Sequence, residues 1–234
     1  MLKIAFFVEG LTEQIFVEKL LIEILGHNNL SIQKRKITGG RKTPISIVQI
    51  GSPQLNSSAS YYFAIYDCSG DSSIPSYIRA TRSNLIKNKF KKVFGILDVR
   101  PKYKRNEIEK LKTGLYYNLP QKTLKTKFIL SIMEIEAWFL AEENHFKKID
   151  ISLTSELIIN KFGYDLSTYN TELFDEPACL LNSIYSLVGK RYTKKSSRIS
   201  RTVESLDYAN LYINVRGRNK SFSNLLEELE FINN

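Results

Sequence analysis

Five acidic residues stand at the expected ends of strands or within one helical turn after them, positions from which they could bind a metal ion. They are Glu9, Glu13, Asp98, Glu134 and Glu136. Three apolar runs lead into them, at residues 2–8, 92–97 and 127–133. Carboxylate oxygens are the ligands that Mg²⁺ and Mn²⁺ prefer, and clustered carboxylates repel one another unless a cation neutralises them. Such an ion could generate a hydroxide nucleophile and stabilise the charge that develops on a phosphodiester.

Each of these acids also has an ordinary structural explanation. A single Asp at the end of a strand usually caps a helix or forms a turn, and an acid in the first turn of a helix often only compensates the helix dipole. For any one residue taken alone, that explanation is the better one. Three strands that end in the same way weaken it. Spacing by itself leaves a metal site and purely structural acids about equally well supported.

The segments that must position these acids alternate between strand-like and helix-like patterns. Short β-rich runs are followed by stretches in which apolar residues recur with helical spacing, and Gly26 is a suitable stop for the first helix. We expect strands at 2–8, 61–67, 92–98 and 127–133, and helices at 11–25, 74–90, 104–117 and from 134 onward. This alternation predicts an α/β fold with a mostly parallel sheet flanked by helices. In such sheets, sites form outside the carboxyl ends of the strands.

Two further regions complete the expected organisation. Residues 27–60 mix short β-like runs with the loop TGGRKTP and a serine-rich stretch, so we interpret them as an insertion that contains a hairpin. After about residue 150 the strand pattern stops, and helical segments are expected at 153–163, 176–188, 197–207 and 222–232. We therefore expect a core at residues 1–150 and a helical extension packed on it at residues 151–234, which carries the most basic region.

Positive charge exceeds negative charge, with 34 Lys and Arg against 24 Asp and Glu and a net charge of +10. The excess favours a polyanionic partner, although a basic protein interface would explain charge alone nearly as well. Lys and Arg gather near residues 87–92, 100–105 and 187–220. Three separate clusters favour a nucleic-acid surface over a membrane anchor, which would prefer one amphipathic helix. The residues expected to bind nucleic acid are Lys190, Arg191, Lys194, Lys195, Arg198, Arg201, Arg216 and Arg218.

The sequence also limits the cell location and the alternative chemistries. No run approaches the roughly 20 apolar residues that a membrane helix needs, and the apolar start is too short for a signal peptide because Glu9 interrupts it. Cys68, Cys179 and the two histidines show no zinc-ligand spacing. A disulfide stays open, but a reduced cytoplasmic protein is the simpler interpretation. We expect Cys68 to be a buried thiol and not a nucleophile.

Five sequence blocks resemble, in order, those of a known family. VEGLTEQIFVEKLL is similar to the first Toprim motif of the overcoming-lysogenization-defect (OLD) nucleases, in which Val-Glu-Gly-x-Thr-Glu precedes an apolar helix. SGDSSIPSYI resembles their Gly-rich turn and helix, and FGILDVRP resembles the strand that ends in a metal-binding Asp. IMEIEAWFLA resembles their Glu-x-Glu block, and RNKSFSNLLEEL their C-terminal Lys-containing block. The similarity spans most of the chain, but only the first and fourth blocks are specific individually.

The resemblance implies a metal-binding role for each matching acid. Glu9 and Glu13 would match the family's paired glutamates, of which one or both bind metal. Asp98 would match its strand-end aspartate. Glu136, with Glu134 as second choice, would match its later acid.

Three further residues would assist these acids. By resemblance, Lys220 would stabilise the transition-state phosphate or the leaving group, and Gly10 would allow close backbone approach at the turn. We also expect Arg100 to serve as an auxiliary cation. Arg100 also marks a departure, because the family usually has Asp-x-Asp where this chain has Asp98-Val99-Arg100. The loss of the second acid should weaken one of two metal positions. Three alternatives stay open: the enzyme uses one ion, the later acids Glu134 and Glu136 hold a second ion, or the protein is an inactive descendant.

The function that the resemblance implies is a Toprim-like, metal-dependent nuclease that hydrolyses phosphodiester bonds of DNA or RNA with Mg²⁺ or Mn²⁺. OLD-type Toprim domains work with an ATPase, and this chain has no nucleotide-binding motif. The resemblance therefore implies a separate ATPase subunit, in an anti-phage or mobile-element system. A homodimer stays open. The alternative is a catalytically inactive Toprim-like module that binds nucleic acid or protein.

Overall fold

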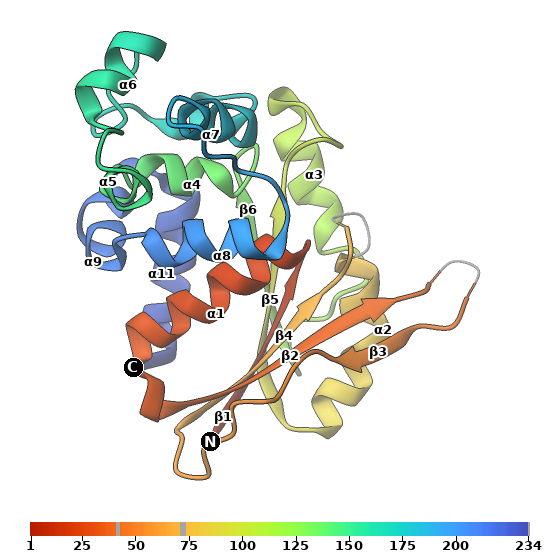
Figure 1. Cartoon of the computed structure of the whole chain (residues 1–234). Coiled ribbons are helices and arrows are strands. Elements are labelled where there is room, and N and C mark those ends of the chain that lie inside the picture. Colours follow the sequence, from red (N-terminus) through yellow and green to blue (C-terminus); the bar gives the residue numbers. More distant parts are fainter. Residues whose placement is uncertain (41–42, 71–73, 234) are drawn as a thin grey trace. The chain divides into compact units, whose positions relative to one another are not determined.

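The computed structural model, which describes residues 1–40, 43–70 and 74–233, contains a six-stranded sheet with the strand order β3-β2-β4-β1-β5-β6 (Figure 1). β1 pairs in parallel with β4 and β5, β2 pairs in parallel with β4, and β3 runs antiparallel to β2. The strands are β1 (Leu2–Val8), β2 (Leu30–Thr38), β3 (Ser46–Gln49), β4 (Tyr61–Asp67), β5 (Phe90–Asp98) and β6 (Lys125–Ser131). The expected α/β fold with a mostly parallel sheet flanked by helices is confirmed.

The internal contacts of the chain divide it into two units. Unit 1 comprises Met1–Leu97 and Asn106–Ile129, and unit 2 comprises Asp98–Arg105 and Leu130–Asn234. The helices of unit 1 are α1 (Leu11–Leu25), α2 (Ile74–Lys87) and α3 (Ile108–Leu115). Those of unit 2 are α4 (Glu136–Ala141), α5 (His145–Ile149), α6 (Ser155–Phe162), α7 (Pro177–Ser186), α8 (Ser196–Ser205), α9 (Tyr208–Asn210), α10 (Arg216–Arg218) and α11 (Lys220–Asn233). Within the described residues, no helix is both long enough and apolar enough to cross a membrane.

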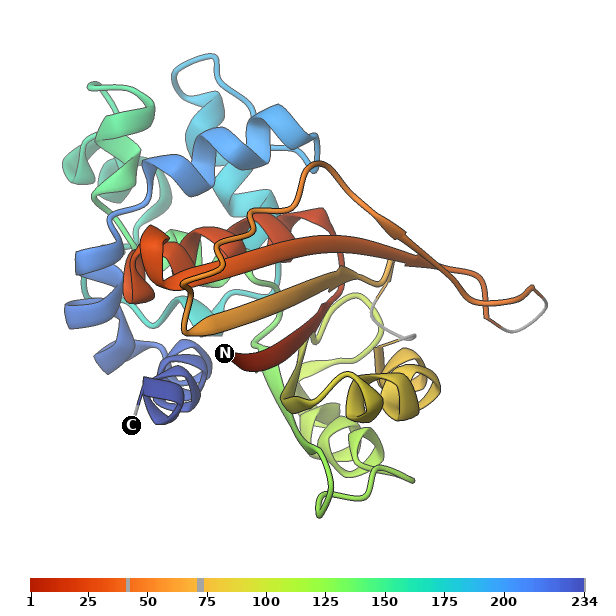
Figure 2. The same ribbon diagram turned by 90° about the horizontal axis from the view of Figure 1, so that it is seen from below.

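In unit 1, α1 and α2 cover opposite faces of the sheet (Figure 2). The chain leaves β1 through α1 toward β2, and it leaves β4 through α2 toward β5, so the two crossovers run in opposite directions along the sheet. The neighbouring strands β1 and β4 therefore form a topological switch point, where open α/β sheets commonly bind ligands. Gln14 fixes α1 to its face, because its Nε2 donates hydrogen bonds to the carbonyl oxygens of Arg35 and Ile65 at 3.0 and 2.9 Å.

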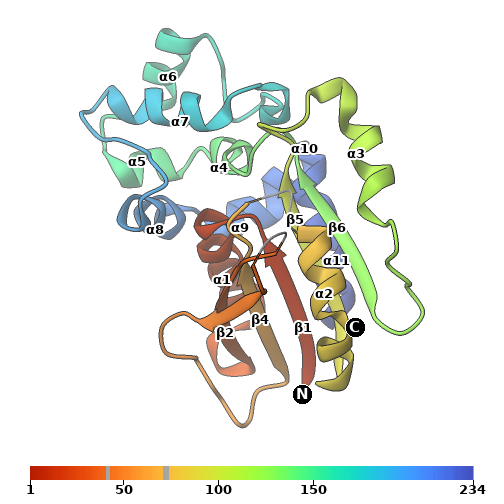
Figure 3. The same ribbon diagram turned by 90° about the vertical axis from the view of Figure 1, so that its right-hand side faces the viewer.

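In unit 2, the helix α4 is the centre of the packing. All six of its residues are buried, and it packs against α7, while α5 packs against α8 (Figure 3). Trp138 of α4 is fully buried, and its Nε1 donates a hydrogen bond of 2.7 Å to Ser221 Oγ. Its ring lies 5.4 Å from that of Phe222, so the start of α11 is fastened to α4. The expected extension at 151–234 lies wholly within unit 2.

Several boundaries differ from those that the sequence predicts. The expected hairpin within 27–60 forms between β2 and β3, and β2 is also a parallel member of the main sheet. The helix predicted at 74–90 ends at Lys87, because Lys89 takes a left-handed φ of 64° and β5 already begins at Phe90. β6 begins two residues earlier than predicted, and the short helices α5, α9 and α10 have no counterpart in the sequence prediction. Residues 71–73, inside the Gly-rich block, lie outside the described residues.

Candidate functional site

Glu9 and Glu13 belong to unit 1 and lie at its topological switch point. Glu9 directly follows β1, and its carbonyl oxygen accepts a hydrogen bond of 2.8 Å from the backbone amide of Gly70, in the turn after β4. The amide of Cys68 likewise donates to the carbonyl oxygen of Val8 at 2.9 Å. The turns after the two strands are thus tied together, and Glu9 is held where the two crossovers diverge.

Glu13 takes part in capping α1. Its Oε2 accepts a hydrogen bond of 2.8 Å from the backbone amide of Gly10, and its side chain is only 2 % exposed. This is one half of a capping box, in which the acid at the third helical position satisfies the amide at the N-cap. Gly10 has an extended φ of −160°, and a β-carbon there would meet Glu13 Oε2 at 3.6 Å, an ordinary contact. The chain itself therefore sets no steric demand for glycine at position 10.

Asp98 belongs to unit 2 and is the last residue of β5. Its side chain is buried, and its Oδ1 accepts hydrogen bonds from Ser131 Oγ at 2.6 Å and from the amide of Ile135 at 2.9 Å. Ile135 separates Glu134 from Glu136 in the sequence. The Asp98 carboxylate is therefore bound to the backbone of the turn that carries the two later acids.

Glu134 and Glu136 are held close together at the start of α4. Burial raises the pKa of Glu134, the hydrogen bond of 2.9 Å that its Oε2 accepts from the amide of Ala178 lowers it, and the charge of Glu136 raises it further, so the net shift is upward. Glu136 is fully buried, and its Oε1 accepts a hydrogen bond of 2.7 Å from the Tyr192 hydroxyl. Lys194 Nζ lies 3.9 Å from the same oxygen. Among the described residues, Glu136 Oε2 has no hydrogen-bond partner.

The chemistry of these acids fits a hard divalent cation in part. The donor set contains only oxygen, which Mg²⁺ and Mn²⁺ prefer, and a buried carboxylate oxygen without a partner is costly unless a cation or a donor meets it. In the part of the chain that the structure describes, however, no group of three or more His, Cys, Asp and Glu side chains is arranged to hold a metal ion. Two of the expected ligands lie in unit 1 and three lie in unit 2.

The two expected assisting cations of unit 2 have different surroundings. Arg100 Nη1 lies 2.9 Å from Glu176 Oε1 and donates a hydrogen bond of 2.8 Å to the carbonyl oxygen of Asp175, so an acidic loop already holds this guanidinium. Lys220 is exposed, and its Nζ lies 3.6 Å from Glu227 Oε1. Exposed ion pairs of this kind are weak, so Lys220 could leave Glu227 for a stronger anion at little cost.

The eight basic residues expected to bind nucleic acid fall into three groups. Four are exposed: Lys190, Arg191, Lys194 and Lys195. Arg198 and Arg201 are half-buried and donate hydrogen bonds to Thr193 Oγ1 and to the carbonyl oxygen of Arg191. Arg216 and Arg218 form ion pairs with Glu230 at 2.7 Å and with Glu143 at 3.1 Å. The exposed group is therefore the part of this region best suited to meet phosphates.

Sequence reasoning missed a buried acid of unit 2 whose two carboxylate oxygens are both hydrogen-bonded. Glu142 is fully buried, and its two carboxylate oxygens accept four hydrogen bonds. The donors are the amides of Asn144, His145 and Asp207 and the side-chain Nδ2 of Asn210. No spacing pattern links residue 142 to residues 207 and 210, so only the fold shows this network.

Two tyrosines of unit 2 and one cysteine of unit 1 have structural positions. Tyr185 is fully buried and Tyr192 nearly so, which places both in the core of unit 2. Cys68 and Cys179 are free, and Cys68 is buried as expected. Burial, together with the charge of Asp67, raises the pKa of the Cys68 thiol, which disfavours a nucleophilic thiolate there.

Comparison with known proteins does not extend these observations. No family model, no curated protein and no solved structure matches the chain.

Proposed function

We propose that the protein is a metal-dependent nuclease that hydrolyses phosphodiester bonds of DNA or RNA. The observation that carries the proposal is the turn between β6 and α4. There the Asp98 carboxylate binds the amide between Glu134 and Glu136, and Glu136 keeps a buried oxygen without a partner among the described residues. Carboxylates are expensive to bury together, and a bound cation is the usual compensation.

In this proposal, the residues that hold Mg²⁺ or Mn²⁺ are those that the resemblance implies: Glu9, Glu13, Asp98, Glu134 and Glu136. Within unit 1, the strand pairing supports the place of Glu9, because Val8 lies opposite Ile96 near the carboxyl ends of the parallel strands β1 and β5. When bound, such an ion supplies a water of lowered pKa and stabilises negative charge on the phosphate.

The chain's own residues have supporting roles. The Tyr192 hydroxyl fixes the Glu136 carboxylate through its hydrogen bond to Oε1, and Asp98 fixes the turn that carries it. Lys220, with its weak exposed ion pair, would meet the charge that develops on the phosphate, and Arg100 would act on Glu134 as a fixed positive charge. The exposed basic residues of 190–195 would hold the nucleic-acid backbone without reading its sequence.

The wider role is that of an effector in an anti-phage or mobile-element system, with a separate ATPase subunit. This part of the proposal rests on the resemblance of the five sequence blocks to OLD-type nucleases.

The test compares cleavage of supercoiled plasmid and of total tRNA in the presence of Mn²⁺, Mg²⁺ or EDTA. Wild type is compared with Glu136→Gln, which keeps the hydrogen bond from Tyr192, and with Glu156→Gln, an exposed acid in α6 outside the proposed site. We expect cutting that EDTA abolishes, a loss on the order of 100-fold in Glu136→Gln and no change in Glu156→Gln. Unfolding midpoints show whether each variant is folded.

A binding module without catalysis is the second candidate, because capping explains Glu13 and turn hydrogen bonds explain Asp98 without a metal. Such a module would bind nucleic acid equally well with and without Glu136→Gln, and it would cut neither substrate with any ion. Binding without metal-dependent cutting by the wild-type protein would therefore overturn the nuclease in favour of the module.

A further inference from the structure

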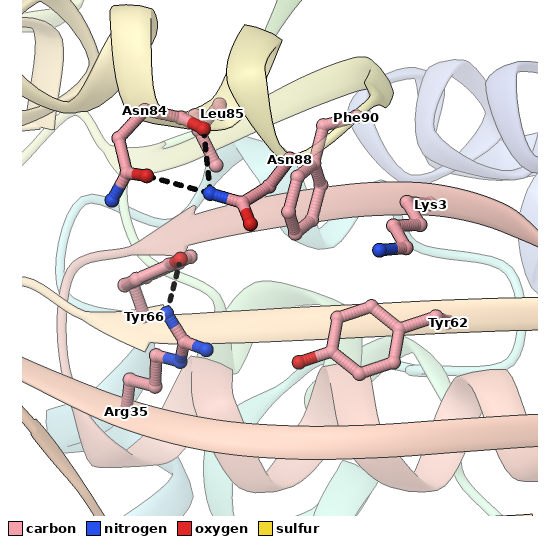
Figure 4. Close-up of a pocket in the computed structure, with 8 residues that line it drawn as sticks. All are labelled: Lys3, Arg35, Tyr62, Tyr66, Asn84, Leu85, Asn88 and Phe90. Carbon is pink, nitrogen blue, oxygen red and sulfur yellow. Dashed lines mark hydrogen bonds between the residues drawn. The ribbon is translucent and has the colours of Figure 1, made fainter.

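A polar cavity lies in unit 1, on the face of the sheet that α2 covers. Its volume is about 120 Å³, and it is lined by Lys3, Arg35, Tyr62, Tyr66, Asn84, Leu85, Asn88 and Phe90 (Figure 4). Lys3, Tyr62 and Arg35 come from the three adjacent strands β1, β4 and β2. Figure 4 shows the Lys3 amine, the Tyr62 hydroxyl and the Arg35 guanidinium directed at the same space. At about 30 Å³ per water molecule, the cavity has room for about four waters.

The cavity carries two positive charges and no negative one. None of its lining residues is acidic, and neither Lys3 nor Arg35 has a carboxylate within ion-pair distance among the described residues. Aromatic rings support both cations instead: Lys3 Nζ lies 5.9 Å from the centre of the Tyr62 ring, and Arg35 Cζ lies 5.4 Å from that of Tyr66. A ring holds a cation in place without neutralising it. The unneutralised charge therefore favours an anionic ligand.

The hydrogen bonds of Arg35 position its guanidinium and leave donors available. Its Nε and Nη2 donate to Gln33 Oε1, and its Nη1 donates to the Tyr66 hydroxyl at 3.0 Å. A guanidinium has five N–H groups, so two have no acceptor among the described residues. Burial raises the pKa of Tyr66, although Arg35 opposes the shift, so the hydroxyl stays protonated at neutral pH. Since that hydroxyl accepts from Arg35, its own proton is available to a ligand oxygen.

The end of α2 does not account for these cations. The last carbonyl groups of a helix attract positive side chains, which would give Lys3 a purely structural role. The carbonyl oxygen of Asn84, in the last turn, already accepts hydrogen bonds from the amide and from Nδ2 of Asn88, at 2.9 and 2.8 Å. The Asn84 carbonyl group of the helix end is thus satisfied by the chain itself and does not need a cation from the cavity.

We propose that this cavity binds a phosphate group. Its size suits a tetrahedral oxyanion, and Lys3, Arg35 and the Tyr66 hydroxyl offer the charge-assisted donors that phosphate oxygens require. Two of the lining residues, Asn84 and Asn88, are exposed, so the cavity has access to the solvent for the rest of a phosphorylated molecule. The inference does not depend on the proposed nuclease activity, because unit 1 alone supplies every residue of the cavity.

Calorimetric titration of the full chain with inorganic phosphate, AMP and adenosine tests the proposal. We expect wild type to bind phosphate or AMP with a dissociation constant below about 1 mM and adenosine undetectably. Lys3→Gln and Arg35→Gln should each weaken binding at least about tenfold. Lys122→Gln is the matched control, because it removes one exposed charge of unit 1 that does not line the cavity, and it should leave binding unchanged within about twofold.

The results distinguish free phosphate from a phosphomonoester as the ligand, and they include outcomes that overturn the proposal. Equal affinity for phosphate and AMP identifies the free anion as sufficient, and tighter binding of AMP identifies a phosphomonoester. No binding of either compound overturns the proposal. If Lys122→Gln lost as much affinity as Lys3→Gln and Arg35→Gln, binding would be due to general charge attraction, and the proposal would be wrong. Adenosine bound as tightly as AMP would show that the cavity does not recognise the phosphate group. Lys3→Gln keeps the test valid if Arg35→Gln fails to fold.

Discussion

Two fully buried glutamates of unit 2 show how surroundings separate a structural acid from a candidate functional one. Both oxygens of Glu142 accept two hydrogen bonds each, so its desolvation is offset within the protein. Glu136 has a hydrogen bond on Oε1, and its Oε2 has no partner among the described residues. A buried carboxylate oxygen left unsatisfied costs free energy, which makes Glu136 the better candidate of the two for a functional role.

At the residue scale, Glu142→Gln should destabilise the protein by about 2–4 kcal/mol. In the glutamine, the amide nitrogen would replace one carboxylate oxygen and would face two N–H groups that now donate hydrogen bonds to that oxygen. Burial raises the pKa of Glu142, but the hydrogen bond and charge of His145 and the bonds from Asn210 and Asp207 outweigh it and lower the pKa below 4.5. The ionised form therefore stabilises the fold above pH 4.5, and this contribution is lost as the pH falls through the folded-state pKa.

Urea unfolding at several pH values measures this effect. The difference in the free energy of unfolding between wild type and Glu142→Gln should be largest at pH 7 and should decrease as the pH falls below 4.5. The neighbouring Glu143→Gln is the control, because its partly exposed ion pair with Arg218 is worth at most about 1 kcal/mol. A gap that stays constant down to pH 3 would contradict a role for the charge of Glu142.

At the element scale, Gly95 sets how closely β5 packs against its neighbours in unit 1. A β-carbon at Gly95 would lie 2.5 Å from Phe128 Cδ1 of β6 and 3.2 Å from Ile74 Cγ2 of α2. The Phe128 ring is held edge-on against Tyr116 at 5.1 Å, so it has little room to move. We expect Gly95→Ala to cost about 1–3 kcal/mol through overpacking.

Gly114→Ala provides the matched comparison. Gly114 lies in α3, and nothing lies within 4 Å of a β-carbon built there. Because glycine lowers helix stability through its conformational freedom, this substitution should stabilise the protein by about 0.4–1 kcal/mol. Thermal unfolding of the two variants should shift in opposite directions, and a stabilised Gly95→Ala would show that the sheet can open around position 95.

The elements that the sequence predicts best are those with a long apolar signal and clear limits. It predicts β1 and α1 at the residues where they are found, because β1 is a mostly apolar run and α1 has apolar residues at helical spacing between Gly10 and Gly26. The segment 208–218 has no such pattern. Its helices α9 and α10 have three residues each, and less than one turn cannot show a 3.6-residue period.

The same reasoning explains what could be predicted of the candidate site. The position of Asp98 at the end of β5 follows from the apolar run before it. Its hydrogen bond to the amide of Ile135 could not be predicted, because it depends on how residues 37 apart in sequence come together. The cavity beside α2 left no sequence signal either, since Lys3, Arg35 and Tyr62 become neighbours only through the strand order β2-β4-β1.

At the scale of the whole molecule, the net charge of +10 should make nucleic-acid binding strongly dependent on salt. The exposed residues Lys190, Arg191 and Lys195 are the expected source of the local contacts. Replacing all three with Gln should weaken binding of a labelled duplex and reduce the slope of log affinity against log salt by about 0.9 for each phosphate that is no longer neutralised. Fluorescence anisotropy at several salt concentrations measures both quantities.

The control for this prediction must remove the same charge from a different place. Lys110, Lys122 and Lys125 are exposed residues of unit 1, and their replacement by Gln lowers the net charge by the same amount. Long-range attraction depends on total charge, whereas counterion release depends on which cations touch phosphates. The control should therefore slow association slightly and leave the slope almost unchanged. Equal slopes for the two triple variants would mean that the positive charge acts only as a diffuse field, and that residues 190–195 do not form the nucleic-acid surface.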